Sequence, residues 1–394
     1  AAPGAATWYV NDADTTGDVY TTRAGNAGYS GNNADSPVLT VSQALGLCSA
    51  GDTIYVDAGT YSDSPTISLS SVTVLGAAAA LTILDAGDST TISVYGITVT
   101  GCTGVTIRNL TIRNAYDGVM LSGSSSGATV SENRILGNGS IGVQLNVSSG
   151  NSIVNNWIAN NSETGIYVTD NSSNNLFAQN QISGNGDYAI RISATGSCLA
   201  DTFEKNVITG NTINGVFNQQ GVTYEFTRNW WGSTDSTVVS GNLLNTGGGW
   251  LSYTPYRLGA VDTAANADTI APAAPGVVLA AGVSSSSCSI SWEAATTNEE
   301  VGGGLSDLAG YRVYRSETSD TNWWYQVADV GNSDSYTDAG LTASTTYYYR
   351  VTAYDNHSPW LNESWYSDSL ASAVTTAAPG AATWYVNDAD TTGD

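Results

Sequence analysis

The sequence predicts an all-β protein in which a solenoid of short parallel strands is followed by a β-sandwich. Three observations support this prediction: 43 glycines among 394 residues, an asparagine that recurs at a nearly constant period over residues 100–232, and short alternating strands over residues 277–375. Glycine and asparagine are favoured in turns, so a chain rich in both forms many short strands rather than long helices.

An internal repeat defines the predicted solenoid. Its asparagines are separated by 24, 23, 24 and 26 residues, at Asn109, Asn133, Asn156, Asn180 and Asn206. A small residue and then a β-branched residue follow nine and ten positions later, as in Gly142-Val143. This period suits a coil of three short strands whose apolar side chains stack on their copies one coil away. Because stacked asparagine side chains can bond one another, we predict that these five form a ladder at a bend.

The repeat resembles that of the right-handed parallel β-helix, the pectate-lyase-like superfamily. The N-terminal region is similar to that family's cap and first coil, and Asn229-Trp230-Trp231-Gly232 resembles its closing sequence. The resemblance implies a right-handed parallel β-helix over residues 1–262. Residues 40–47 are expected to form a short cap helix, because an open coil end exposes an unpaired strand edge. The matching N-terminal segments are Trp8-Tyr9-Val10-Asn11-Asp12, Ser36 to Leu45, Gly51 to Val56 and Ala58 to Tyr61.

The rest of the chain resembles a fibronectin type III domain. Residues 263–275 are interpreted as a linker, and residues 276–376 as the sandwich. Trp292 supplies an expected core side chain, and residues 341–354 resemble the tyrosine corner and its following strand. The resemblance implies the fold of this region but says little about its function. Residues 377–394 repeat residues 1–18 without a change, so we expect them to begin another β-helix unit.

The charge excludes two classes of partner. The net charge is −24, from 35 acidic and 11 basic side chains. Such a charge repels nucleic acids and anionic membrane surfaces, so we expect neither as a partner. The sequence contains no apolar run of the length that spans a bilayer, and no membrane insertion is expected.

Catalytic groups are sparse in the predicted β-helix. Its lysine is Lys205, it has no histidine, and its scattered aspartates fall at different positions of the repeat. Lyase or hydrolase chemistry needs a base or paired carboxylates that converge. Arg191 beside Asp187 is the remaining candidate pair, and we favour an exposed, solvated pair over a catalytic one. We therefore predict that the protein is not an enzyme, with a carbohydrate-active lyase or hydrolase as the less favoured alternative.

Residues 11–18 contain the best candidate metal ligands, Asp12, Asp14, Thr16 and Asp18. Alternating oxygen ligands around a glycine turn suit Ca²⁺, which is the cofactor we expect; a solvated turn is the alternative.

Seven asparagines stand in N-x-[ST] sequences, and those best placed to carry glycans are Asn146, Asn160 and Asn171.

The four cysteines show no metal-binding spacing. Cys48 and Cys102 are the candidate disulfide, with buried free thiols as the alternative.

The identical ends predict assembly. The expected joint comprises Trp8, Tyr9 and Val10 and their copies Trp384, Tyr385 and Val386. The chain is either one unit of a tandem array or a subunit whose tail docks on a neighbour. Identity at all eighteen positions favours the array. We predict a prokaryotic, extracellular or cell-surface structural protein that assembles end to end into a filament, stalk or surface array. The alternative is an adhesin module that binds extracellular polysaccharide.

Overall fold

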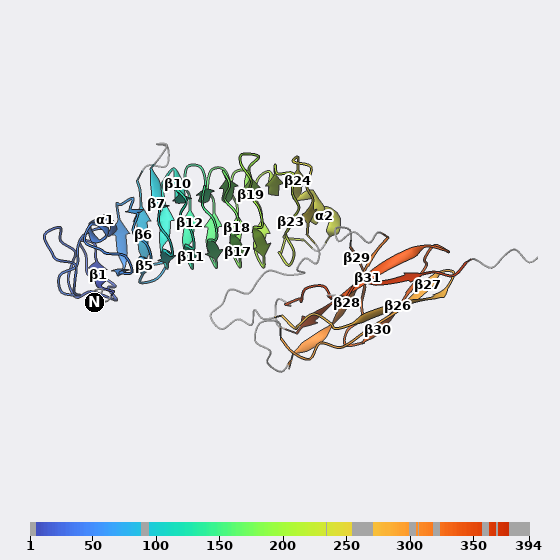
Figure 1. Ribbon diagram of the computed structural model, residues 1–394. Coiled ribbons are helices and arrows are strands. Elements are labelled where there is room, and N and C mark those ends of the chain that lie inside the picture. The colour runs from blue at the N-terminus through green and yellow to red at the C-terminus, as the bar shows by residue number, and fades with distance from the viewer. Residues whose placement is uncertain are drawn as a thin grey trace, which may run out of the picture. The chain divides into compact units, whose positions relative to one another are not determined.

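The computed structural model describes residues 5–87, 94–233, 235–253, 271–298, 305, 307–317, 324–356, 362–367 and 369–377. The chain divides into two compact units, Ala1–Thr269 and Ile270–Asp394 (Figure 1). Most of the predicted linker, and all but the first residue of the copied segment 377–394, lie outside the described residues. No helix in the described ranges has the length and apolarity needed to cross a bilayer.

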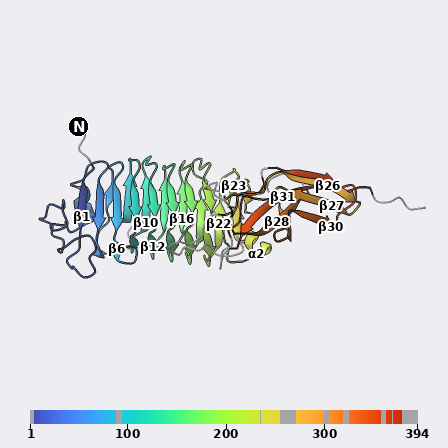
Figure 2. The ribbon, with the colours of Figure 1, turned by 90° about the horizontal axis from the view of Figure 1, so that it is seen from below.

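The first unit is a parallel β-helix built from three sheets, which we call A, B and C. From β2 to β22, successive strands of the chain enter the three sheets in turn, and each sheet is hydrogen-bonded along the axis of the coil (Figures 1 and 2). Sheet A contains β1 (Thr7–Val10), β2 (Thr53–Val56), β5 (Thr73–Gly76), β8 (Thr106–Arg108), β11 (Thr129–Ser131), β14 (Ser152–Val154), β17 (Leu176–Ala178) and β20 (Thr202–Glu204). Sheet B contains β3 (Gly59–Tyr61), β6 (Thr82–Asp85), β9 (Thr111–Arg113), β12 (Arg134–Leu136), β15 (Trp157–Ala159), β18 (Gln181–Ser183) and β21 (Val207–Thr209). Sheet C contains β4 (Thr66–Ile67), β7 (Tyr95–Thr100), β10 (Asp117–Ser122), β13 (Val143–Asn146), β16 (Ile166–Thr169), β19 (Tyr188–Ile192), β22 (Asn214–Asn218) and β24 (Leu243–Asn245).

The core is a set of apolar rows that run along the coil. In sheet A the central, inward residue of each strand faces its copy in the next strand: Ile107, Val130, Ile153, Phe177 and Phe203. All five side chains are fully buried. The rings of Phe177 and Phe203 stack with centroids 4.8 Å apart. Each of these three-residue strands therefore directs its central side chain into the core, as expected for strands whose successive side chains point to opposite faces.

An asparagine ladder holds the bend between sheets A and B. The Asn180 Oδ1 accepts hydrogen bonds from the backbone N–H (3.0 Å) and Nδ2 (3.1 Å) of Asn156. The same pattern links Asn133 to Asn156, Asn180 to Asn206, and Asn206 to Asn229. The prediction is thus confirmed for four of its five residues.

Asn109 is the exception, and its assignment to the ladder was wrong. It lies one position before the ladder, at a left-handed corner with φ of 61°, and Leu110 N donates to Asn133 Oδ1 instead. The corner position is filled by Glu132, Asn155, Gln179 and Lys205 in the following coils, all with φ near 56°. The 24-residue spacing from Asn109 to Asn133 therefore contains one residue more than the coil-to-coil register.

Two further ladders follow the same geometry. Asn138, Asn161, Asn185 and Asn211 form one between sheets B and C. The other, between sheets C and A, runs from Asn151 through Asn175 to Asp201, whose Oδ1 accepts from Asn175 N (2.8 Å) and Nδ2 (2.9 Å). Each bend of the coil thus has its buried polar backbone groups satisfied from the neighbouring coil.

The repeated small residue permits close approach of adjacent coils. A Cβ added to Gly142 would lie 2.6 Å from the carbonyl oxygen of Gly165 and 2.6 Å from Cγ2 of Ile158. A side chain at Gly142 would therefore push these coils apart, which explains the glycine at this position.

Both ends of the β-helix are covered. At the N-terminal end, α1 (Val41–Leu45) begins with a capping box between Thr40 and Gln43 and buries Val41 and Ala44, as the cap-helix prediction required. At the other end Trp231 is buried against Phe226. The end also carries α2 (Ser236–Gly241) and the paired short strands β23 (Tyr224–Glu225) and β25 (Leu251–Ser252).

The second unit is a β-sandwich of the fibronectin type. Trp292 and Tyr311 are buried in its core, with ring centroids 5.6 Å apart. The predicted tyrosine corner is present, because Tyr347 Oη accepts a hydrogen bond from Thr342 N at 3.0 Å. One sheet comprises β26 (Val278–Ser284), β27 (Ser287–Trp292) and β30 (Ser335–Ala339). The other comprises β28 (Leu308–Ser316), β29 (Tyr325–Asp329), β31 (Thr346–Asp355) and β32 (Ala371–Val374).

All four cysteines are free, so the candidate disulfide between Cys48 and Cys102 is not formed. Cys102 is buried and its Sγ donates to the carbonyl oxygen of Ile67, while half-buried Cys48 packs against the apolar core. Burial raises the pKa of the Cys48 thiol to about 12. Both therefore behave as small apolar side chains.

We expect Asn180→Ala to destabilise the β-helix by about 2–4 kcal/mol, because the buried backbone N–H of Asn156 loses its acceptor, while Ile153 O and Asn206 Oδ1 each lose one donor. The Asn180 side chain is fully buried and its Nδ2 donates to Ile153 O at 2.7 Å. Chemical denaturation measures the effect. Asn146→Ala, at a half-exposed strand end, is the matched control and should change stability by less than about 0.5 kcal/mol. Equal losses in the two variants would contradict the role of the ladder.

We expect Asp201→Asn to stabilise the protein above neutral pH. Burial raises the pKa of Asp201 to about 7, and its Oδ2 is buried with no hydrogen-bond partner in the described residues. The folded state therefore favours the protonated acid. Its stabilising contribution is complete below the unfolded pKa of about 3.9 and is lost as the pH rises through about 7.

Asparagine keeps the acceptor without the charge. The gain from Asp201→Asn should grow between about pH 4 and pH 7 and reach roughly 2–4 kcal/mol. Denaturation at a series of pH values measures it, with Asp187→Asn in a half-exposed loop as the control. A gain that does not vary with pH would refute the assignment.

Candidate functional site

The N-terminal strand β1 lies in a slot formed by other parts of the same unit. On one side it pairs in parallel with β2 over four residues. On the other side residues 31–38 complete its hydrogen bonds, with Tyr9 N donating to Gly31 O (2.7 Å) and Val38 N donating to Tyr9 O (2.9 Å). The outer edge of β1 is thus closed by its own chain. We call the slot formed by β2, residues 31–38 and Asp52 the β1 seat.

Asp52 anchors the strand in this seat. Its Oδ1 accepts from Ala6 N (2.7 Å), and its Oδ2 accepts from Trp8 Nε1 (2.9 Å) and Ser49 N (2.8 Å). Burial raises the pKa of Asp52, but these hydrogen bonds outweigh it and leave the pKa below its ordinary value. Asp52 is therefore ionised at neutral pH, when its hydrogen bonds to the strand are strongest.

The three predicted joint residues contact the body of the unit in different ways. Trp8 packs on the apolar core, Val10 is fully buried in it, and the ring of Tyr9 stacks on that of Tyr55 at 5.8 Å. Their copies Trp384, Tyr385 and Val386 lie outside the described residues.

The predicted calcium ligands form a hydrogen-bonded loop beyond the strand. Asp12 Oδ1 accepts from Asp14 N at 2.8 Å, Asp14 Oδ1 accepts from Thr16 Oγ1 at 3.0 Å, and Asp18 Oδ2 accepts from Asn11 Nδ2 at 2.7 Å. Burial raises the pKa of Asp18. The described part of the chain contains no group of three or more histidine, cysteine, aspartate or glutamate side chains arranged to bind a metal ion. Calcium binding stays a prediction.

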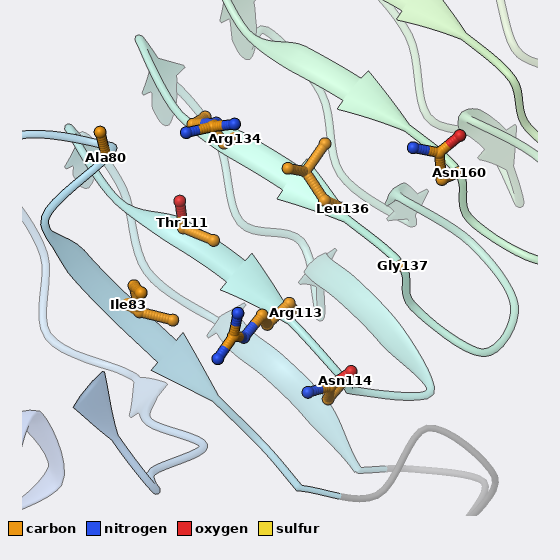
Figure 3. A pocket seen from close by; sticks show the side chains of 9 residues that line it. All are labelled: Ala80, Ile83, Thr111, Arg113, Asn114, Arg134, Leu136, Gly137 and Asn160. Carbon is orange, nitrogen blue, oxygen red and sulfur yellow. The ribbon is translucent and has the colours of Figure 1, made fainter.

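A second candidate site is a hollow of about 330 Å³ on the outer face of sheet B, which we call the sheet-B hollow (Figure 3). The row Ile83, Thr111 and Arg134 crosses it, so the short Thr111 lies between two longer side chains. The complete lining is Ala80, Ile83, Thr111, Arg113, Asn114, Arg134, Leu136, Gly137 and Asn160. Sequence reasoning missed this site, because a hollow across three coils leaves no local motif.

The two arginines of the hollow differ in their partners. Arg113 Nε donates to Asp85 Oδ2 at 2.9 Å. Burial raises the pKa of Asp85, but hydrogen bonds from Asn114 and Arg113 outweigh it and lower that pKa. Arg134 lies over the ring of Trp157 at 4.8 Å, and its buried Nε has no hydrogen-bond partner in the described residues. The hollow therefore presents a cation to solvent on a strongly acidic protein.

The candidate catalytic pair Arg191 and Asp187 is not formed in the structure. Arg191 Nε and Nη2 donate to Gln219 Oε1, both at 3.2 Å, and its guanidinium lies over the rings of Tyr167 and Phe217. The outward aromatic residues of sheet C thus hold an arginine of their own chain.

Asp117 is the strongly perturbed carboxyl of sheet C. Its pKa is raised to about 6, chiefly by burial, with a smaller contribution from Glu163. Its Oδ1 accepts from Ile141 N at 3.0 Å.

The candidate glycan acceptors Asn160 and Asn171 are exposed, and Asn146 is half-exposed; their modification stays a prediction.

These features define a class of protein: a parallel β-helix followed by a fibronectin-type sandwich. Residues 40–254 match the family described as "Periplasmic copper-binding protein (NosD)". The chain belongs to the NosD family. The periplasmic description is consistent with the expectation of a prokaryotic protein outside the cytoplasm.

Comparisons also relate parts of the chain to larger proteins. An α-amylase of Niallia circulans is 42% identical over 96 residues, which are 24% of this chain and 6% of the relative. Exoglucanase B of Cellulomonas fimi is 31% identical over 201 residues, covering 43% of this chain and 17% of the relative. A solved Fn3-like protein from Clostridium thermocellum shares 27% identity, with a TM-score of 0.21, over 27% of this chain and 97% of its own. The chain thus spans a minor part of both curated relatives.

The copper in the family's description can be tested against the donors present. Copper in proteins is bound by histidine, cysteine and methionine side chains that converge on one point. His357 lies outside the described residues, and the four cysteines are free thiols. No convergent set occurs in the described part of the chain. The described donors therefore do not fit a copper site.

Proposed function

We propose that this chain is a structural unit of an extracellular assembly, in which β-helix and sandwich modules follow one another end to end. The observation that carries the proposal is the position of residues 1–18. Residues 7–18 form the first strand and the following loop of the β-helix, and the whole segment 1–18 occurs again at residues 377–394, after the sandwich. The second copy has every residue needed to occupy the β1 seat of a following unit.

The structure supports a mechanical role for the β-helix. Its sheets are hydrogen-bonded along the axis, and buried asparagine ladders add side-chain bonds between coils in the same direction. Extension therefore has to break many parallel bonds together. The net charge of −24 opposes unspecific lateral association between such rods.

The test is a two-unit chain, in which residues 1–376 are followed by residues 1–394. We expect the internal copy of residues 1–18 to fold as β1 of the second β-helix. Hydrogen exchange should show that this segment is much more strongly protected than residues 377–394 of the one-unit chain. Electron microscopy should show the modules as a linear series.

Equal exchange of the segment in both chains would contradict the proposal. The matched control replaces the Asp52 of the second unit by Ala, which removes the anchor and should abolish the extra protection. The measurement is repeated with Ca²⁺ and with a chelator. If the predicted calcium loop exists, Ca²⁺ increases the protection.

A second candidate function is polysaccharide binding at the sheet-B hollow. The observation that favours it is Arg134, which has an aromatic neighbour and no carboxylate partner in the described residues. Arginine binds carboxylate groups through directed, charge-assisted hydrogen bonds. A saccharide with carboxylate groups would therefore be preferred over a neutral one. The partial relatives with carbohydrate-active names agree with a carbohydrate-rich setting.

We expect Arg134→Gln to weaken binding of an acidic polysaccharide about tenfold, because one charge-assisted contact is lost. Affinity electrophoresis in gels that contain an acidic or a neutral polysaccharide measures this. Arg108→Gln is the control, since Arg108 is exposed on sheet A and paired with Glu132 at 2.7 Å. Identical retardation of both variants, or none for the unchanged protein, would rule the site out.

A further inference from the structure

We infer that the β1 seat is an exchangeable binding site, which accepts residues 377–394 of a second copy of this chain in place of residues 1–18. This inference rests on the proposed end-to-end assembly and names a non-covalent route to it. The partner is the same protein, and the occupant is the repeated segment.

The contacts of the resident segment all involve residues that the copy retains. Ala6 and Trp8 bond Asp52, and Val10 fills the core. Further along, Asp12 Oδ2 accepts from Thr60 N at 3.1 Å, and Asn11 bonds Asp18. The corresponding residues are Ala382, Trp384, Val386, Asp388, Asn387 and Asp394. Since the two segments are identical, a seated copy makes the same contacts with the same intrinsic affinity.

The seat is completed by residues outside the repeated segment. Strand β2, Asp52 and residues 31–38 all occur once in the chain. A chain therefore carries one seat and two segments that fit it. The surplus segment can be accommodated only in another seat, whether that seat belongs to a covalently following unit or to a separate molecule.

The resident segment has the advantage of its tether. A segment on the same chain has an effective concentration in the millimolar range, about a thousandfold above a micromolar partner. Exchange therefore becomes visible when the resident segment is weakened and the copy is not. Trp8→Ala does this selectively: it removes the hydrogen bond to Asp52 and the packing on the core, a loss of about ten- to a hundredfold in occupancy of the seat.

The experiment compares four full-length chains by sedimentation velocity at tens of micromolar. We expect Trp8→Ala to form dimers and longer chains, with an average mass that increases with concentration. The double variant Trp8→Ala/Trp384→Ala has the same weakened resident segment but no intact copy, and it should remain monomeric. The unchanged protein and Trp384→Ala should also remain monomeric.

A peptide provides a second measurement that does not depend on association. The synthetic segment 377–394, added to the double variant, should bind and raise its melting temperature, and a peptide with Trp384→Ala should not. Association of both Trp8 variants to the same extent, or of neither, overturns the inference, as does a peptide without effect. If exchange fails while the two-unit chain still protects its internal segment, the covalent assembly stands and the non-covalent route is wrong.

Discussion

The hydrogen bond between an asparagine side chain and the backbone of the preceding coil is the interaction on which the β-helix depends. Short strands leave the bends without ladder partners, and a buried backbone N–H without a partner is costly. Asn180 supplies two such partners: its Oδ1 accepts from the backbone N–H of Asn156, and its Nδ2 donates to the carbonyl oxygen of Ile153. Because each ladder fixes the register of the bend, the apolar rows of the three sheets stay aligned from coil to coil.

The same constraint limits which residues the coil tolerates. Gly142 faces a carbonyl oxygen of the next coil at a distance that excludes a side chain, and Asp201 replaces an asparagine at the cost of a buried, protonatable acid. The aromatic stack of Phe177, Phe203 and Phe226 fills the interior near the C-terminal end of the helix. Surface chemistry is consequently confined to outward residues such as Arg134, which change without disturbing the coil.

Much of the fold could be predicted from the sequence, because the residues that stabilise the coil recur at a regular spacing that the sequence itself shows. The register failed at Asn109, where counting asparagines cannot distinguish a corner residue from its neighbour in the ladder. The ladder that ends at Asp201 was missed because a carboxylate interrupts the asparagine pattern. The expected contact between Arg191 and Asp187 was wrong for another reason. The direction of the Arg191 side chain depends on which aromatic rings the neighbouring coils present. The sheet-B hollow arises only when three coils are superposed.

The closed outer edge of β1 has a consequence for growth. A strand that pairs in parallel with β2 on one side and with residues 31–38 on the other leaves no free edge for a second N-terminal end. Two molecules therefore cannot join head to head through this strand, and the contact is heterologous. Any fibre built on it has two chemically different ends, one with a seat and the other with a segment. Its subunits all point the same way, and length can be limited by capping either end alone.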